Sequence, residues 1–171
     1  MGRTPAWESE YVDYVMARQR SFLRTAYAML GSWPAAEDAV QSTFTALYAH
    51  WPRARSVNTE AYGRRVLVNT CISASRKRAR EVVTDQVPDR VSHEDTGAIE
   101  LMDALARLPV RDRAVLSLRF LEDLSVRDVA AACDIPEGTV KSQTSRALAR
   151  LEELLSPPLP SSGTHERRNQ R

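Results

Sequence analysis

The sequence has few of the residues that mark several large protein classes. Its 171 residues include two cysteines, Cys71 and Cys133, which form no C-x-x-C pair, so neither a disulfide scaffold nor a zinc knuckle is indicated. No apolar run approaches the roughly 18 residues that span a membrane, and the first residues lack the apolar core of a signal peptide. We therefore expect a cytoplasmic protein with no membrane insertion.

A large excess of charge of one sign is also missing. The chain has 24 Lys and Arg against 22 Asp and Glu, a net charge of +2, which excludes a uniformly basic surface that coats nucleic acid. The charge is uneven, however, because residues 53–80 contain eight basic residues and one acidic residue, whereas residues 85–95 contain four acidic residues and one arginine. The basic stretch indicates a local surface that binds nucleic acid, and the acidic stretch predicts a flexible linker.

Recognisable catalytic patterns are absent as well. His50, His93 and His165 are scattered, and the sequence contains no H-E-x-x-H, P-loop or G-x-S-x-G motif. The acids of the linker have no predicted helix to hold them at a catalytic spacing. We expect a protein that is not an enzyme and that uses no metal or cofactor.

Helical periodicity dominates the first half of the chain. Apolar residues recur at three-four spacing, and no run alternates with a period of two. A first helix stops at Gly31, a second opens at Ser32 and ends near Trp51-Pro52, and Thr59 is the expected N-cap of a third over 60–80. One face of the third helix is expected to carry Tyr62, Val66, Asn69, Ile72 and Ser73.

The second half predicts shorter helices. Two of them flank Pro109, and Ser125-x-x-Asp128 has the form of a capping box that opens another helix. Residues 134–136 break that helix, and a longer one follows from residue 137. Its buried positions are expected to be Val140, Thr144, Ala147, Leu148, Leu151 and Leu155. A helix, a short break and a longer helix are typical of a helix-turn-helix.

The pattern as a whole predicts an all-α protein of two small helical domains joined by an acidic flexible linker, the C-terminal domain being a helix-turn-helix. The expected divisions are a disordered N-terminus over 1–8, a first domain over 9–80, the linker over 81–97, a second domain over 98–155 and a disordered tail over 156–171.

The outer face of the last helix suits a DNA major groove. A period of 3.6 residues places Lys141, Ser142, Ser145 and Arg146 opposite the apolar stripe. Arginine pairs with guanine O6 and N7, lysine contacts guanine or phosphate, and serine lets the backbone approach. Taken alone, the face is equally compatible with an ordinary solvated helix. The separate basic stretch over 53–80 makes nucleic-acid binding the better interpretation.

Several segments match a known family in order. Residues 36–44 read AEDAVQSTF, residues 61–69 read AYGRRVLVN, and residues 135–142 read IPEGTVKS. The chain thereby resembles, from about Ser9 to Leu155, the bacterial RNA polymerase sigma factors, specifically the extracytoplasmic-function (ECF) class of the sigma-70 family in its actinobacterial form. The resemblance implies a factor that binds core RNA polymerase, directs promoter-specific transcription initiation and helps to open the DNA.

The resemblance also implies roles for individual residues. Asp38 and Gln41 would dock on the clamp helices of the polymerase's largest subunit, and the flap region would be a further part of the polymerase that the protein contacts. The minus-10 promoter element would be bound by Asn58, Arg64, Arg65, Asn69, Arg76, Lys77, Arg78 and Arg80. The minus-35 element would be read as duplex by Lys141, Ser142, Ser145 and Arg146. An anti-sigma factor is a further partner that the class implies.

Three residues near the third helix are less easily assigned. Trp51 and Tyr62 are the aromatic residues closest to the expected site of strand opening, and we expect both to be core residues rather than platforms for a base. Gly63 lies inside the predicted helix, where glycine costs up to about 1 kcal/mol relative to alanine.

Two other functions remain open at this point. An autonomous helix-turn-helix regulator would use the first domain for sensing or dimerisation, and would bind a palindromic site as a dimer. A protein-only signalling adaptor is a further alternative. The basic third helix and the AEDAVQ segment favour the sigma factor, because a sensor domain has no need of either.

Overall fold

The computed structural model describes residues 5–56, 58–81 and 96–156, and all regular structure within these ranges is helical. The predicted all-α class is therefore confirmed. Most of the predicted linker, and the predicted tail after Ser156, lie outside the described residues. The described residues form seven helices, which are α1 (Glu8–Leu30), α2 (Trp33–Ala54), α3 (Thr59–Glu81), α4 (Thr96–Ala106), α5 (Val110–Phe120), α6 (Val126–Cys133) and α7 (Glu137–Leu155).

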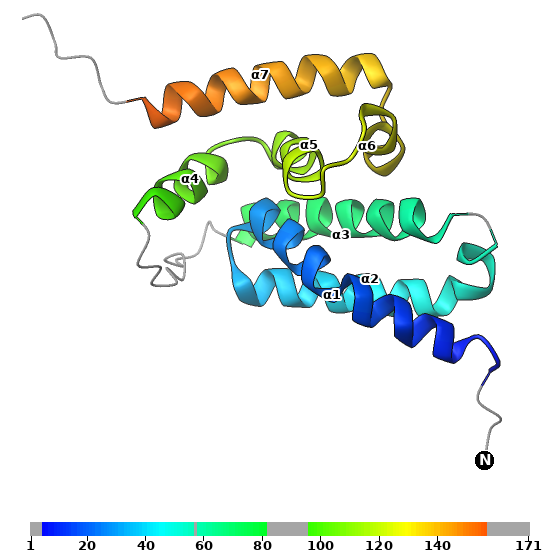
Figure 1. Cartoon of the computed structure of the whole chain (residues 1–171). Helices are drawn as coiled ribbons and strands as arrows, with labels where there is room; N and C mark the ends of the chain where they lie inside the picture. The colour runs from blue at the N-terminus through cyan, green and yellow to red at the C-terminus, as the bar shows by residue number, and fades with distance from the viewer. Residues whose placement is uncertain (1–4, 57, 82–95, 157–171) are drawn as a thin grey trace, which may run out of the picture.

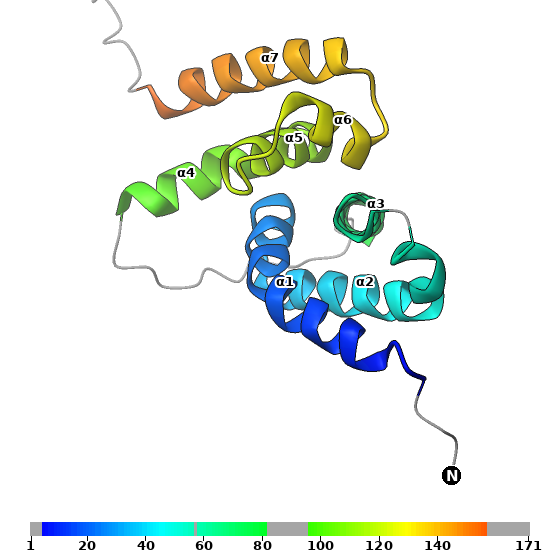
Figure 2. The same cartoon turned by 45° about the vertical axis from the view of Figure 1, so that its right-hand side comes forward.

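The helices form two units that pack against each other. Helices α1–α3 make the first unit, and α4–α7 make the second (Figure 1). Helices α5 and α6 lie between α7 and the first unit, with α5 against α1 and α6 against α3, as both views show (Figure 2). Buried residues of both units, such as Phe22 and Val68 in the first and Leu118 and Val129 in the second, belong to one continuous apolar cluster.

Several helix ends follow the predicted signals. Gly31 closes α1 in the left-handed region (φ +67°), and its N–H donates to the Tyr27 carbonyl at 2.7 Å. The Ser32 hydroxyl caps α2 at its N-terminus. The Ser125 Oγ accepts from the Asp128 N–H at 3.1 Å, which is the expected cap of α6.

Two predicted ends in the first unit were wrong. Helix α2 continues through Pro52 to Ala54, because proline at this position removes only one backbone N–H close to the end of the helix. Thr59 is not the N-cap of α3, since the Asn58 Oδ1 accepts from the Ala61 N–H at 3.0 Å. The Thr59 hydroxyl instead donates to the Ala54 carbonyl at 3.3 Å and so joins α2 to α3.

The residues predicted to share one face of α3 do not form its buried side. Tyr62, Asn69 and Ser73 are exposed, and the buried residues are Gly63, Leu67, Val68, Cys71 and Ile72. The apolar residues do not follow a single stripe because α3 packs against α1 and α2 on one side and against α6 on another. Gly63 is required by packing, because a Cβ there would overlap the Tyr14 hydroxyl and lie 3.3 Å from Phe22 Cζ.

The structure also differs from the predictions in α7 and at the N-terminal end of the described residues. Leu148 and Leu155 of α7 are exposed rather than buried, because the short α4 leaves the outer side of the C-terminal half of α7 uncovered. At the other end, Trp7 packs edge-on against Tyr48 with ring centroids 5.1 Å apart, and the Tyr48 hydroxyl donates to Glu8 at 3.3 Å. The last residues of the predicted disordered N-terminus are therefore ordered by aromatic contact.

Candidate nucleic-acid interface

Helices α6 and α7 have the geometry of a helix-turn-helix. Asp134 ends α6 in the left-handed region (φ +57°), and Pro136 is the N-cap of α7. The side of α7 opposite buried Val140 and Ala147 is open to solvent. All four residues predicted to read duplex DNA are exposed on α7, namely Lys141, Ser142, Ser145 and Arg146.

Contacts within the second unit hold this face in place. The Gln143 amide donates to the Asp112 carboxylate at 2.7 Å, which ties α7 to α5. The Arg146 Nε donates to the Ser142 carbonyl at 3.4 Å. Within the described ranges, no acidic side chain forms an ion pair with Lys141 or Arg146. Their charges are available to an anionic partner.

The C-terminal half of α3 forms a second basic surface. Arg76, Lys77 and Arg80 are exposed, and Lys77 makes a surface pair with Glu81 at 3.9 Å. Such a pair contributes little and does not neutralise the surface. Arg78 is half-buried, and its guanidinium donates to the Leu30 carbonyl at 3.4 Å. Arg78 thus ties α3 to the end of α1, whereas its three neighbours face solvent.

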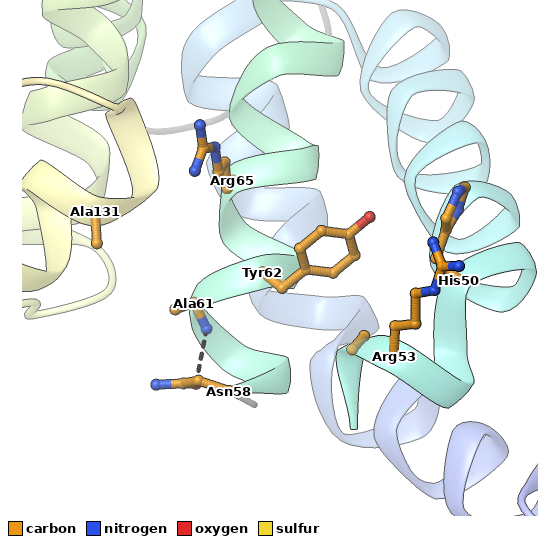
Figure 3. A pocket seen from close by; sticks show the side chains of 8 residues that line it. His50, Arg53, Asn58, Ala61, Tyr62, Arg65 and Ala131 are labelled. Atoms are coloured by element: carbon orange, nitrogen blue, oxygen red, sulfur yellow. Dashed lines mark hydrogen bonds between the residues drawn. The ribbon is translucent and has the colours of Figure 1, made fainter. Parts of the chain in front are cut away.

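A cavity of about 460 Å³ lies beside the start of α3 (Figure 3). Its lining comes from α2, the α2–α3 turn, α3 and α6, and consists of His50, Arg53, Ala54, Asn58, Ala61, Tyr62, Arg65 and Ala131. In Figure 3 the Tyr62 ring extends from α3 toward the side of α2 that carries Arg53. Tyr62 is 36% exposed, so the expectation of a core residue was wrong. An aromatic face next to cationic groups suits a stacked base and its phosphate.

The two asparagines predicted near this pocket lie apart. Asn58 lines the cavity. Its side-chain Oδ1 caps α3, which leaves the side-chain NH₂ for a ligand. Asn69 is exposed and lies roughly 16 Å from Asn58 along the axis of α3, at a rise of 1.5 Å per residue. One captured base therefore cannot contact both side chains.

Arg64 and Arg65 are occupied by acidic partners. The Arg64 side chain is 15% exposed and lies 3.4 Å from Glu60 and 3.5 Å from Glu122. The Arg65 guanidinium pairs with Asp134 at 3.0 Å. Glu122 and Asp134 both belong to the second unit. The two arginines assigned to the minus-10 element thus contact the helix-turn-helix unit in this structure.

Sequence reasoning missed the network around Arg64. Glu60 also pairs with Arg18 of α1 at 2.6 Å, and the Thr25 hydroxyl donates to Glu122 at 3.0 Å. Tyr14 lies beside this network, and its pKa is raised by burial and, second, by the charge of Glu60. These residues are far apart in the sequence and form no motif, so only the fold brings them together.

The residues expected to contact polymerase lie on the exposed side of α2. Asp38 and Gln41 are both exposed. Gln41 lines a groove of about 460 Å³ between α1 and α2, together with Glu37 and the partly apolar wall formed by Tyr11 and Val15. Asp38 lies outside the groove lining, three residues earlier on the same helix.

Trp51 and Cys71 are core residues, and Cys133 is partly buried against the core. Trp51 is 1% exposed and packs against the rings of Tyr11 and Tyr14, as expected. Burial raises the pKa of the Cys71 thiol to about 12 and that of Cys133 to about 11, so neither is a thiolate near neutral pH. Among the described residues, no group of three His, Cys, Asp or Glu could hold a metal, and none of their helices is long and apolar enough to cross a membrane.

Comparison with known proteins places this geometry in a family. Residues 14–81 match the family profile for sigma-70 region 2, and residues 98–151 match the profile for sigma-70, region 4. The RNA polymerase sigma-E factor of Streptomyces coelicolor is 36% identical over 152 residues, which cover 85% of this chain and 86% of that protein. The ECF RNA polymerase sigma factor SigM of Mycobacterium tuberculosis is 36% identical over 96 residues, covering 53% of this chain and 48% of that protein.

A solved structure agrees with the sequence relatives. The sigma factor RpoE of Bartonella quintana, in complex with the anti-sigma factor NepR, superposes with a TM-score of 0.73 at 27% identity and covers 85% of this chain and 96% of that one. The two helical units, their order and these relatives lead to one conclusion: the chain belongs to the sigma-70 family and is an ECF sigma factor, a member of a family that directs promoter-specific transcription initiation.

Proposed function

We propose that this sigma factor binds core RNA polymerase and reads both the minus-35 and the minus-10 element of its promoters. The observation that carries the proposal is the exposed face of α7, where Lys141, Ser142, Ser145 and Arg146 stand without an acidic partner among the described residues. A major groove admits such a helix, and its base edges and phosphates match these side chains.

At the minus-35 element, Arg146 is the main candidate for reading a base. A bidentate contact to guanine is worth roughly 1 to 3 kcal/mol of discrimination. Arg146→Ala should therefore relax specificity at one promoter position, whereas Arg107→Ala, an exposed arginine after α4, should not. Equal weakening on every promoter sequence would instead make Arg146 a phosphate contact.

At the minus-10 element, α3 supplies phosphate contacts and the neighbouring cavity accepts an unpaired base. Arg76, Lys77 and Arg80 are exposed along the helix, and such contacts give salt-dependent affinity. The cavity beside Tyr62 offers a ring for stacking and the Asn58 amide for a hydrogen bond. Holding one base outside the stack favours the opened strand, which is how binding would help to melt the promoter.

The polymerase contacts are proposed on both units. Asp38 and the groove that contains Gln41 would receive the clamp helices of the largest subunit. The uncovered leucine side of α7, with Leu148 and Leu155, would meet the flap region. Asp38→Ala should weaken binding to core polymerase and leave the thermal unfolding curve unchanged, with the exposed Asp103→Ala of α4 as the control for loss of one negative charge.

An anti-sigma protein is the second partner that we propose. The Bartonella structure pairs a similar sigma factor with the anti-sigma factor NepR. A pull-down with this chain from resting native cells should recover a stoichiometric protein besides polymerase. Recovery of polymerase alone would contradict this part of the proposal.

The direct test is reconstituted transcription. Purified chain and sigma-free core polymerase are incubated with a random DNA pool, and the bound sequences are recovered and used as templates. We expect two enriched elements at a fixed spacing and a transcript that starts downstream of them. Enrichment of a palindrome by the chain alone, with no effect of polymerase, would point to an autonomous regulator.

A further inference from the structure

We propose that a cavity of about 190 Å³ between α3, α5, α6 and α7 binds a small apolar carboxylic acid, whose hydrocarbon part fills the cavity and whose carboxylate is held by Arg111 and Arg146. The cavity lies where these four helices meet and shares no lining residue with the one beside Tyr62. It gives the chain a small-molecule ligand besides its proposed DNA and protein partners.

The inner part of the cavity is apolar. Val68 and Ile72 of α3 line it four residues apart, opposite Val115 of α5, and Ile135 in the turn between α6 and α7 adds a further apolar side chain. The two valines are fully buried. An engineered apolar cavity of roughly 150 Å³ stays dry and binds benzene. The volume in this chain therefore suits a single ring or a branched chain of about six carbons.

The solvent side of the cavity is cationic. Arg111, Thr139 and Arg146 line it, and all three are exposed. Within the described ranges, neither arginine forms an ion pair. The Arg146 Nε donates to the Ser142 carbonyl at 3.4 Å, which leaves its terminal amino groups for a ligand. A guanidinium donates two parallel hydrogen bonds to a carboxylate, and the Thr139 hydroxyl is a further donor. An anionic head group is therefore favoured over a neutral one.

The walls of the site are held in place by the chain's own contacts. Gln143 lines the cavity, and its amide donates to the Asp112 carboxylate at 2.7 Å, which ties α7 to α5. Cys133 of α6 also lines the cavity; burial raises the pKa of its thiol, and the charge of nearby Arg111 acts in the opposite direction. Arg111 thus lies beside the thiol in the absence of a ligand. A site that is already formed binds a small ligand at a lower entropic cost.

Arg146 connects this site to promoter binding. The same guanidinium cannot hold a carboxylate at the cavity and pair with a base of the minus-35 element. A bound acid should therefore weaken the binding of minus-35 duplex, and this consequence rests on the proposed function of Arg146. The binding of the acid itself does not.

The test titrates the full chain with sodium benzoate, and with benzyl alcohol as a neutral probe of similar size. Binding is measured by isothermal titration calorimetry. The site is located by the rate at which N-ethylmaleimide modifies Cys133, because the other cysteine, Cys71, is fully buried. We expect benzoate to bind about tenfold more tightly than benzyl alcohol, since hydrogen bonds to a charged group are the stronger ones, and to slow the modification of Cys133.

Two variants separate the head group from the cavity. Arg111→Gln should weaken benzoate binding about tenfold and leave that of benzyl alcohol unchanged. The exposed Arg107→Gln controls for the loss of one positive charge. Cys133→Leu fills the cavity and should abolish the binding of both probes. Because Arg111 is exposed and unpaired among the described residues, its variant decides the question even where Cys133→Leu does not fold.

The effect on DNA is measured by anisotropy with a labelled duplex that carries the recovered minus-35 element. Benzoate should weaken binding more than sodium acetate at the same concentration, which controls for ionic strength. Unchanged duplex binding would remove Arg146 from the site. Absence of saturable benzoate binding, or equal losses in the Arg111 and Arg107 variants, would overturn the inference and leave the proposed function intact. A chain that binds benzoate but supports no transcription with core polymerase would instead refute the proposed function alone.

Discussion

Replacing Gly63 by alanine tests whether α1 and α3 pack as closely as the structure indicates. In an ordinary helix interior the change would stabilise the chain by about 1 kcal/mol. Here the new Cβ would overlap the Tyr14 hydroxyl and lie 3.3 Å from Phe22 Cζ. Overpacking of this kind costs about 1 to 3 kcal/mol. We expect the two effects together to lower the free energy of unfolding by about 1 kcal/mol, and Tm by roughly 2–4 °C.

Tyr14 cannot move aside freely, which is why the cost should exceed the gain. Its ring packs against Trp51 at 5.2 Å and Phe22 at 6.4 Å between centroids, and its hydroxyl donates to the Thr59 carbonyl at 3.4 Å. Tyr14→Phe removes the overlapping atom. The double variant should therefore be about 1 kcal/mol more stable than the sum of the single effects predicts.

The assay is urea unfolding followed by circular dichroism, with Gly138→Ala as the matched control. Gly138 is also helical, but a Cβ there meets nothing within 4 Å, so this variant should be as stable as the wild type or more stable. Stabilisation of the chain by Gly63→Ala, or strict additivity with Tyr14→Phe, would refute the close approach of α1 to α3.

Three further predictions concern single residues. Ser125→Ala should lower the free energy of unfolding by about 1 kcal/mol because the α6 cap is lost. Ser125→Asp should keep most of the stability that the cap contributes, because aspartate also caps helices. Asn58→Asp should keep the α3 cap and its stability but weaken binding to opened promoter DNA, and Asn58→Ala should weaken both; unchanged DNA binding in the aspartate variant would assign Asn58 to capping alone. Burial raises the pKa of Cys71 from 9.0 to about 12, so the folded state retains a proton that the unfolded state releases. Stability from this group is complete below pH 9 and is lost as the pH rises toward 12, which unfolding curves across this range would show against Cys71→Ala.

The sequence predicted the features that depend on neighbouring residues. The glycine stop of α1, the serine cap of α6 and the helix-turn-helix all follow from local patterns, and the structure confirms them. The buried side of α3 could not be predicted in the same way, because its apolar residues serve two neighbours at once. The pairing of Arg64 with Glu122 was also beyond local reasoning, since their proximity depends on how two units pack.

The candidate site residues also differ in how far local sequence patterns predict their surroundings. The exposure of Lys141, Ser142, Ser145 and Arg146 follows directly from the apolar stripe of α7. Asn58 and Tyr62 were singled out for their residue type and position, but the cavity that they line is formed by α2, α3, the turn between them and α6, and local sequence patterns do not reveal such a tertiary feature. Polar side chains at helix ends can serve both the backbone and a ligand.

Association with core RNA polymerase is the property that distinguishes a sigma factor from an autonomous regulator. The purified chain is mixed with sigma-free core polymerase from a related bacterium and passed over a sizing column, with a housekeeping sigma factor as competitor. We expect co-elution that the competitor abolishes and that Asp38→Ala weakens. Elution of the chain apart from polymerase, as a dimer that binds palindromic DNA on its own, would contradict it.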